Sequence, residues 1–155
     1  MNNLPPIVGT ANIILAGDFV APPAAPPHTY LGSARALLNG VRVLAKAQDF
    51  PVVLAMLAAQ VAECSLKAYL PRDGNDKRLR DRALRHNRQD LWSLAHAEGL
   101  PIPQQAPDWL LTLHQLHGTP YYLRYSTGVH GLVFPAAEPM TTALGELVES
   151  VASHM

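Results

Sequence analysis

Residues 51–70 read PVVLAMLAAQVAECSLKAYL and form the most apolar stretch of the chain. Apolar side chains cover almost the whole circumference of a helix drawn through them, so we expect a central helix that other helices surround. Pro51 suits the first turn of this helix, and Pro71 closes it. The longest unbroken apolar run, residues 52–59, is shorter than the about 20 residues that span a bilayer. We therefore expect no membrane association.

Helical patterns also occur on both sides of this stretch. A helix is expected from Ser33, a good N-cap, to about residue 49. Another is expected from about Asn87 to Gly99, where Asn87 and Asp90 have the spacing of a capping box. Two more are expected over 107–117 and 139–152, separated by a less regular stretch over 121–134. The pattern predicts an all-α bundle of four to five helices of the up-and-down type.

Residues 1–32 differ from the rest because they contain six prolines, four of them in the APPAAPP stretch at 21–27. Proline has no amide hydrogen to donate, so this stretch is not expected to hold a helix. We expect an extended, partly polyproline-like N-terminal arm over 1–32 and one helical domain over 33–155.

The bulk composition limits the classes of function. Twelve basic and twelve acidic residues cancel, so no overall field would draw the protein to nucleic acid or to membranes. Cys64 is the only cysteine, which excludes an internal disulfide, and its apolar helical surroundings favour a buried, unreactive thiol. The start lacks the charged and apolar regions of a signal peptide. We expect a cytoplasmic protein.

Positive charge is concentrated in one window, residues 72–88. The window has a local charge of +4, which is suited to phosphate groups. The alternative is a solvated loop whose arginines pair with its own aspartates. The seven basic residues are Arg72, Lys77, Arg78, Arg80, Arg82, Arg85 and Arg88, and the three acidic ones are Asp73, Asp76 and Asp81.

A polar stripe crosses the otherwise apolar second helix. Gln60, Glu63 and Lys67 share one face, and Glu63 precedes Lys67 by four residues, the favourable order for a helical ion pair. In one interpretation the pair lies on the bundle surface. In the other it lines a groove that holds His86, since a buried carboxylate needs a partner.

These residues resemble a known family. The segment AECSLKAYL at 62–70, the basic loop, His86 followed by Asp90-Leu91-x-x-Leu94, and Arg124-Tyr125 together resemble the HEPN-domain family over about residues 33–126. The chain departs from the family pattern by placing three residues between His86 and Asp90. The resemblance implies a helical bundle, a homodimer, association with RNA or a nucleotide, and for toxin-type members a partner protein such as an antitoxin.

The resemblance also implies a chemistry. Arg80-Asp81 followed by His86 fits the Arg-polar-His spacing of the metal-independent ribonucleases in the family. By that resemblance His86 would transfer a proton at the ribose 2′-hydroxyl or the leaving oxygen, and Arg80 would stabilise the phosphate. No cofactor is expected. The expected binding residues are Glu63, Lys67, Arg82, Arg85, Asp90, Arg124 and Tyr125.

Two further groups of side chains have alternative interpretations. Tyr121, Tyr122 and Tyr125 surround Arg124, and their rings would either stack on bases or pack the end of the bundle. His114 and His117 share a helix face, but no third ligand accompanies them, so we expect no metal site. The competing function is a non-catalytic helical domain for dimerisation or protein interaction, favoured by the apolar second helix and the proline-rich arm.

Overall fold

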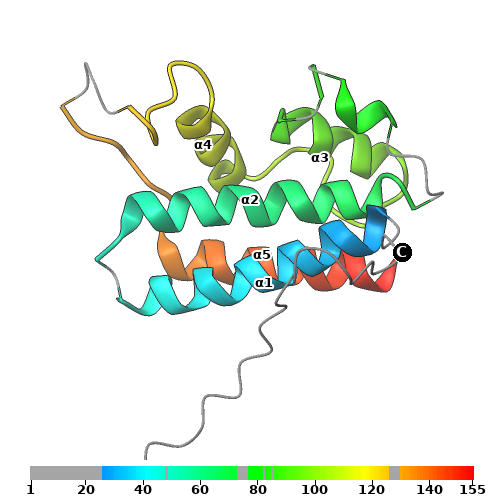
Figure 1. The fold of residues 1–155 in the computed structure, drawn as a ribbon, viewed down its shortest axis with the longest axis horizontal. Coiled ribbons are helices and arrows are strands. Elements are labelled where there is room, and N and C mark those ends of the chain that lie inside the picture. The colour runs from blue at the N-terminus through cyan, green and yellow to red at the C-terminus, as the bar shows by residue number, and fades with distance from the viewer. Residues whose placement is uncertain (1–25, 48, 73–76, 82, 85, 126–129) are drawn as a thin grey trace, which may run out of the picture.

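The computed structural model describes residues 26–47, 49–72, 77–81, 83–84, 86–125 and 130–155 (Figure 1). These residues form five α-helices and a short 3₁₀ helix, with no strand among them, so the predicted all-α bundle is confirmed. The elements are α1 (Pro26–Ala47), α2 (Pro51–Tyr69), η1 (Lys77–Arg80), α3 (Arg88–Ala97), α4 (Asp108–His117) and α5 (Ala137–Ser153).

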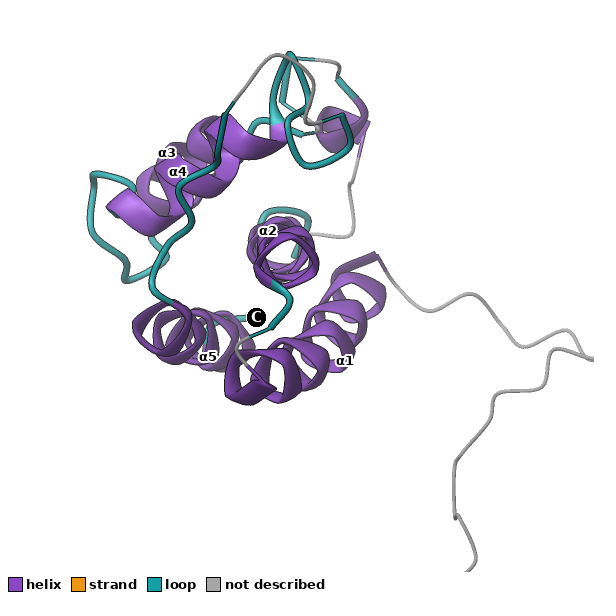
Figure 2. Cartoon of the chain, turned by 90° about the vertical axis from the view of Figure 1, so that its left-hand side faces the viewer, coloured by secondary structure: helices purple, strands orange, loops and turns teal. Residues whose placement is uncertain are grey.

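Helix α2 is the centre of the molecule. Seen along its axis, α1 and α5 lie on one side of it and α3 and α4 on the other (Figure 2). Helix α1 runs antiparallel to α2 and α5 (Figure 1). Val61 and Leu66 have no exposed surface. Small residues allow neighbouring helices to approach closely, and α2 buries five alanines, Ala55, Ala58, Ala59, Ala62 and Ala68.

The predicted start of the first helix is wrong. Helix α1 begins at Pro26, and residues 26–32, assigned to the arm, belong to the helix, with Leu31 buried. Prolines at the very start of a helix are tolerated because the first amides have no partner within it. The Ser33 hydroxyl does not cap but donates to the Thr29 carbonyl, 3.0 Å away. The rest of the predicted arm, residues 1–25, lies outside the described residues.

The other helices follow the sequence pattern closely. The Asn87 side chain caps α3 by accepting from the Asp90 amide at 3.2 Å. Helices α3 and α4 join through an edge-on contact of Trp92 and Trp109, whose ring centroids are 6.4 Å apart. By length and composition alone, α2 is apolar enough to cross a bilayer. However, 67% of its most apolar 18-residue stretch is buried inside the bundle, as in a core helix.

Candidate functional site: a buried carboxylate cluster

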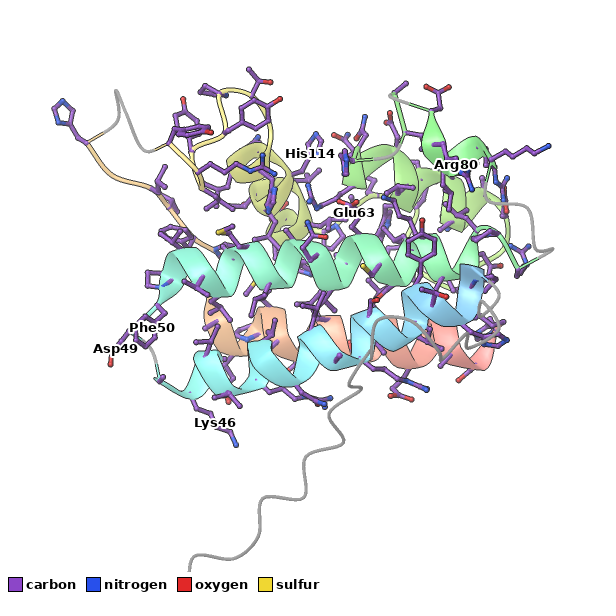
Figure 3. All side chains as sticks on the ribbon, viewed as in Figure 1. Lys46, Asp49, Phe50, Glu63, Arg80 and His114 are labelled. Atoms are coloured by element: carbon purple, nitrogen blue, oxygen red, sulfur yellow. The ribbon has the colours of Figure 1, made fainter. Side chains whose placement is uncertain are left out.

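Glu63 is the centre of a charged cluster on the α3–α4 side of α2 (Figure 3). Its side chain is almost fully buried. Oε1 accepts hydrogen bonds from Lys67 Nζ at 2.7 Å and from His86 Nδ1 at 3.0 Å. Oε2 lies 2.9 Å from Arg88 Nη2. One carboxylate therefore joins α2 to the turn before α3 and to the first residue of α3.

Lys67 decides between the two interpretations of the polar stripe. Glu63 and Lys67 are only 3% and 7% exposed, so the interpretation that the pair lies on the bundle surface is wrong. The Lys67 ammonium also lies 6.0 Å from the centre of the Tyr30 ring on α1, within the range of a cation–π interaction. The Glu63–Lys67 pair is therefore buried, and through Lys67 it connects α2 to α1.

Arg88 is the member of the cluster that the sequence did not single out. It is 3% exposed, and its Nε donates to the Ala59 carbonyl of α2 at 3.0 Å. A cation in the first turn of a helix opposes the helix dipole. That unfavourable position is a signal that Arg88 has a strong partner elsewhere in the fold.

The cluster keeps Glu63 ionised. Burial by itself would raise the pKa of this carboxyl, but the hydrogen bond from Lys67 and the charges of Arg88 and Lys67 outweigh it. The net effect is a pKa below the usual value of the group. At neutral pH the carboxylate therefore accepts hydrogen bonds from Lys67 and His86 and forms an ion pair with Arg88.

His86 is the exposed member of the cluster. Its side chain is 63% exposed, whereas that of Glu63 is 4% exposed. An ionised carboxylate only accepts hydrogen bonds, so the hydrogen in the His86–Glu63 bond lies on Nδ1. This bond fixes the tautomer and leaves Nε2 of the neutral ring with a lone pair for proton exchange.

Two histidines of α4, His114 and His117, lie within the electrostatic reach of Arg88. Burial, together with repulsion from Arg88, lowers the pKa of His117 to about 4 and lowers that of His114 as well. Among the described residues, three buried polar atoms have no hydrogen-bond partner: Glu63 Oε2, His114 Nδ1 and His117 Nε2. The contact of Glu63 Oε2 with Arg88 is thus an ion pair that does not reach hydrogen-bond geometry. Unpartnered polar atoms are rare in folded proteins, and here they gather around one buried arginine.

The basic window is partly neutralised by a residue outside it. Arg72 Nη1 lies 3.2 Å from Glu98 Oε2, and Arg78 also binds the Glu98 carboxylate and the Leu70 carbonyl. Both arginines pair with Glu98, at the C-terminal end of α3. Arg80 is exposed in η1 (Figure 3), whereas Arg82 and Arg85 lie outside the described residues.

The remaining predicted residues lie around the cluster and not in it. At the start of α3, the Asp90 carboxylate accepts a hydrogen bond from the Asn87 side-chain amide. Arg124 and Tyr125 are exposed in the turn after α4, and the Arg124 guanidinium lies 5.8 Å from the centre of the Tyr121 ring. Tyr121 and Tyr125 are 45% and 63% exposed, so a large part of each residue is open to solvent.

Cys64, next to Glu63, is partly buried and not fully buried as predicted. Burial, with a further contribution from the Glu63 charge, raises the pKa of its thiol. A raised pKa keeps the group in the unreactive thiol form.

Comparison with known proteins does not identify the chain. No family model, no curated protein and no solved structure matches it. The HEPN resemblance therefore stays a prediction from the motifs, and function has to be argued from the cluster itself.

Proposed function

We propose that this protein is a HEPN-like module that binds RNA or a nucleotide and acts as a metal-independent endoribonuclease. The observation that supports the proposal is the contact of an exposed His86 ring with a buried carboxylate, 3.0 Å between Nδ1 and Glu63 Oε1. A histidine held in one tautomer, with its other nitrogen available, is suited to proton transfer.

The cluster divides the proposed roles. Glu63, Lys67 and Arg88 are buried and occupied by one another, so they position His86 and do not touch the substrate. Arg80 in η1 is the exposed cation we assign to the phosphate, because its fork of donors matches phosphate oxygens.

The proposed reaction needs only proton transfer and charge stabilisation. His86 Nε2 takes the proton of a ribose 2′-hydroxyl, and the 2′ oxygen forms a bond to phosphorus. The bond from phosphorus to the 5′ oxygen breaks, and that oxygen leaves with a proton. The products are a 2′,3′-cyclic phosphate and a 5′-hydroxyl. By the family resemblance, a second protomer in a homodimer supplies the proton from its own protonated His86.

The decisive test compares two histidine variants on a pool of single-stranded RNAs. We expect the native chain to leave 2′,3′-cyclic phosphate ends that mass spectrometry detects. His86→Ala should slow cleavage by about 10²- to 10⁴-fold, the usual effect of removing a general acid or base. His154→Ala, at an exposed site on the C-terminal end, is the control and should cleave normally. Intact RNA with the native chain, or equal cleavage by His86→Ala, would contradict the nuclease proposal.

A non-catalytic interaction domain is the second candidate. Val43, Phe50 and Val53, at the end of the bundle where α1 meets α2, are 68%, 53% and 46% exposed. Exposed apolar side chains of this size favour contact with another protein, such as a second copy or an antitoxin-like partner. RNA cleavage that is lost in His86→Ala would favour the first candidate, whereas a stable dimer that leaves RNA intact would favour the interaction domain.

A further inference from the structure

A second candidate site is a pocket that lies away from the Glu63 cluster. Its volume is about 710 Å³, and the C-terminal part of α1, the start of α2 and the segment that leads into α5 form its walls. Leu44, Leu54, Phe134 and Met140 give it an apolar surface. This volume falls within the about 300–1,000 Å³ that is typical of small-molecule sites.

The opening of this pocket has an excess of positive charge. Arg42 and Lys46 line it, against one carboxylate, Glu138. The Arg42 guanidinium reaches across to α5, where a Cβ atom added to Gly145 would lie 3.5 Å from Nη2. Lys46 and Phe50 mark this end of the bundle in Figure 3. An apolar wall next to two cations is complementary to a ligand with an apolar body and an anionic head.

The backbone at this pocket also favours a negatively charged ligand. Helices α2 and α5 both begin at the pocket, and neither has a side-chain cap on its N-terminus. The first amides of a helix lack partners inside it and carry partial positive charge. Two helix starts and two basic side chains therefore favour negative charge at the same opening.

We propose that this pocket binds a small amphiphilic carboxylate, such as a medium-chain acyl carboxylate. Its tail lies against Leu54 and Phe134, and its head group interacts with Arg42. The site is independent of the proposed ribonuclease function, since none of the Glu63 cluster residues lines it.

The test uses three probes with the same tail on the full chain: decanoate, decanol and decyltrimethylammonium, titrated by calorimetry and by NMR. We expect decanoate to bind with the highest affinity and the cationic probe with the lowest. Octanoate should bind several-fold more weakly than decanoate, because each buried methylene adds affinity. Equal binding of the anionic and cationic probes, or shifts confined to other parts of the protein, would overturn the proposal.

Matched variants test which side chains form the site. Arg42→Gln should weaken decanoate binding about fivefold, the loss of one partly exposed ion pair, and leave decanol binding unchanged. Arg35→Gln removes an exposed arginine of α1 that does not line the pocket, and should bind decanoate normally. Phe134→Ala should weaken both decanoate and decanol. A folded Arg42→Gln variant with native decanoate affinity would overturn the assignment of the head group.

Discussion

The two sides of α2 are stabilised in different ways. Towards α1 and α5 the helix packs mainly through apolar side chains, with residues such as Ala58 and Leu54 buried, and Lys67 adds a contact with the Tyr30 ring of α1. Towards α3 and α4 it carries Glu63, whose carboxylate holds a lysine, a histidine and an arginine from two segments. Apolar packing is non-directional and tolerates small shifts, whereas the carboxylate cluster requires each partner in place. We expect the apolar side to supply stability and the charged side to supply a fixed geometry.

Glu63→Ala tests the charged side and should have the largest effect. It leaves Lys67 and Arg88 buried without their counter-charge, and breaking such a cluster costs about 3–5 kcal/mol of unfolding free energy. Urea unfolding monitored by circular dichroism measures it. The control Glu149→Ala, at an exposed position of α5, should change stability by less than about 0.5 kcal/mol. Equal values for the two variants would show that the cluster is not coupled to folding.

Leu66→Ala tests the apolar packing of α2 and should cost about 3 kcal/mol. Leu66 has no exposed surface, so the variant loses buried apolar area and leaves a cavity. This cost should be the same at pH 7 and pH 4, because no proton is involved. Val43→Ala, at a side chain that is 68% exposed, is the control and should be nearly neutral. A Leu66→Ala cost that changes with pH would break the distinction between apolar packing and the charged cluster.

The apolar side was predictable from local sequence. The central helix was expected over 51–70 and lies over Pro51–Tyr69, because its periodicity and the flanking prolines act within a few residues. The start of α1 was missed because the prolines at 21–27 were expected to exclude a helix there, although the first turn of a helix accepts proline, as at Pro51. The Glu63–Lys67 pair was also local, at a spacing of four residues.

The charged side depends on contacts between residues that are far apart in the sequence, and these could not be predicted from local patterns. Arg88 forms an ion pair with Glu63 and donates to the Ala59 carbonyl, both on the far side of the η1 loop in the sequence. Arg72 likewise binds Glu98. Which acid a given arginine selects is decided by how α3 packs on α2, and no periodicity encodes that choice. The placement of Arg88 next to the helix N-cap was the one local sign of a distant partner.

His117 provides a smaller, pH-dependent test of the charged side. Its pKa is about 4 in the folded protein, against an ordinary value of 6.5. Between these values the unfolded chain binds a proton that the folded chain does not, so stability falls as the pH drops from about 6.5 to about 4. In His117→Gln the melting temperature should fall less over this range than in the native chain. Thermal melts at pH 7, 5.5 and 4 measure the difference. Identical pH curves for both chains would show that neither burial nor Arg88 lowers the pKa of His117 in the folded protein.

Removing the N-cap of α3 should change stability the least of these variants. It also tests directly whether the cap holds His86 in position. Asn87 lies between His86 and Arg88, and its side chain accepts from the Asp90 amide. Asn87→Ala removes that hydrogen bond and should cost about 1 kcal/mol, measured by urea unfolding. Asn87→Ser, which can cap, should recover most of it. Because the cap fixes the turn that carries His86, Asn87→Ala should also reduce RNA cleavage more than its small loss of stability explains, and Asn87→Ser should restore it. If Asn87→Ala unfolds more easily yet cleaves RNA at the native rate, the position of His86 depends on Glu63 and not on the cap.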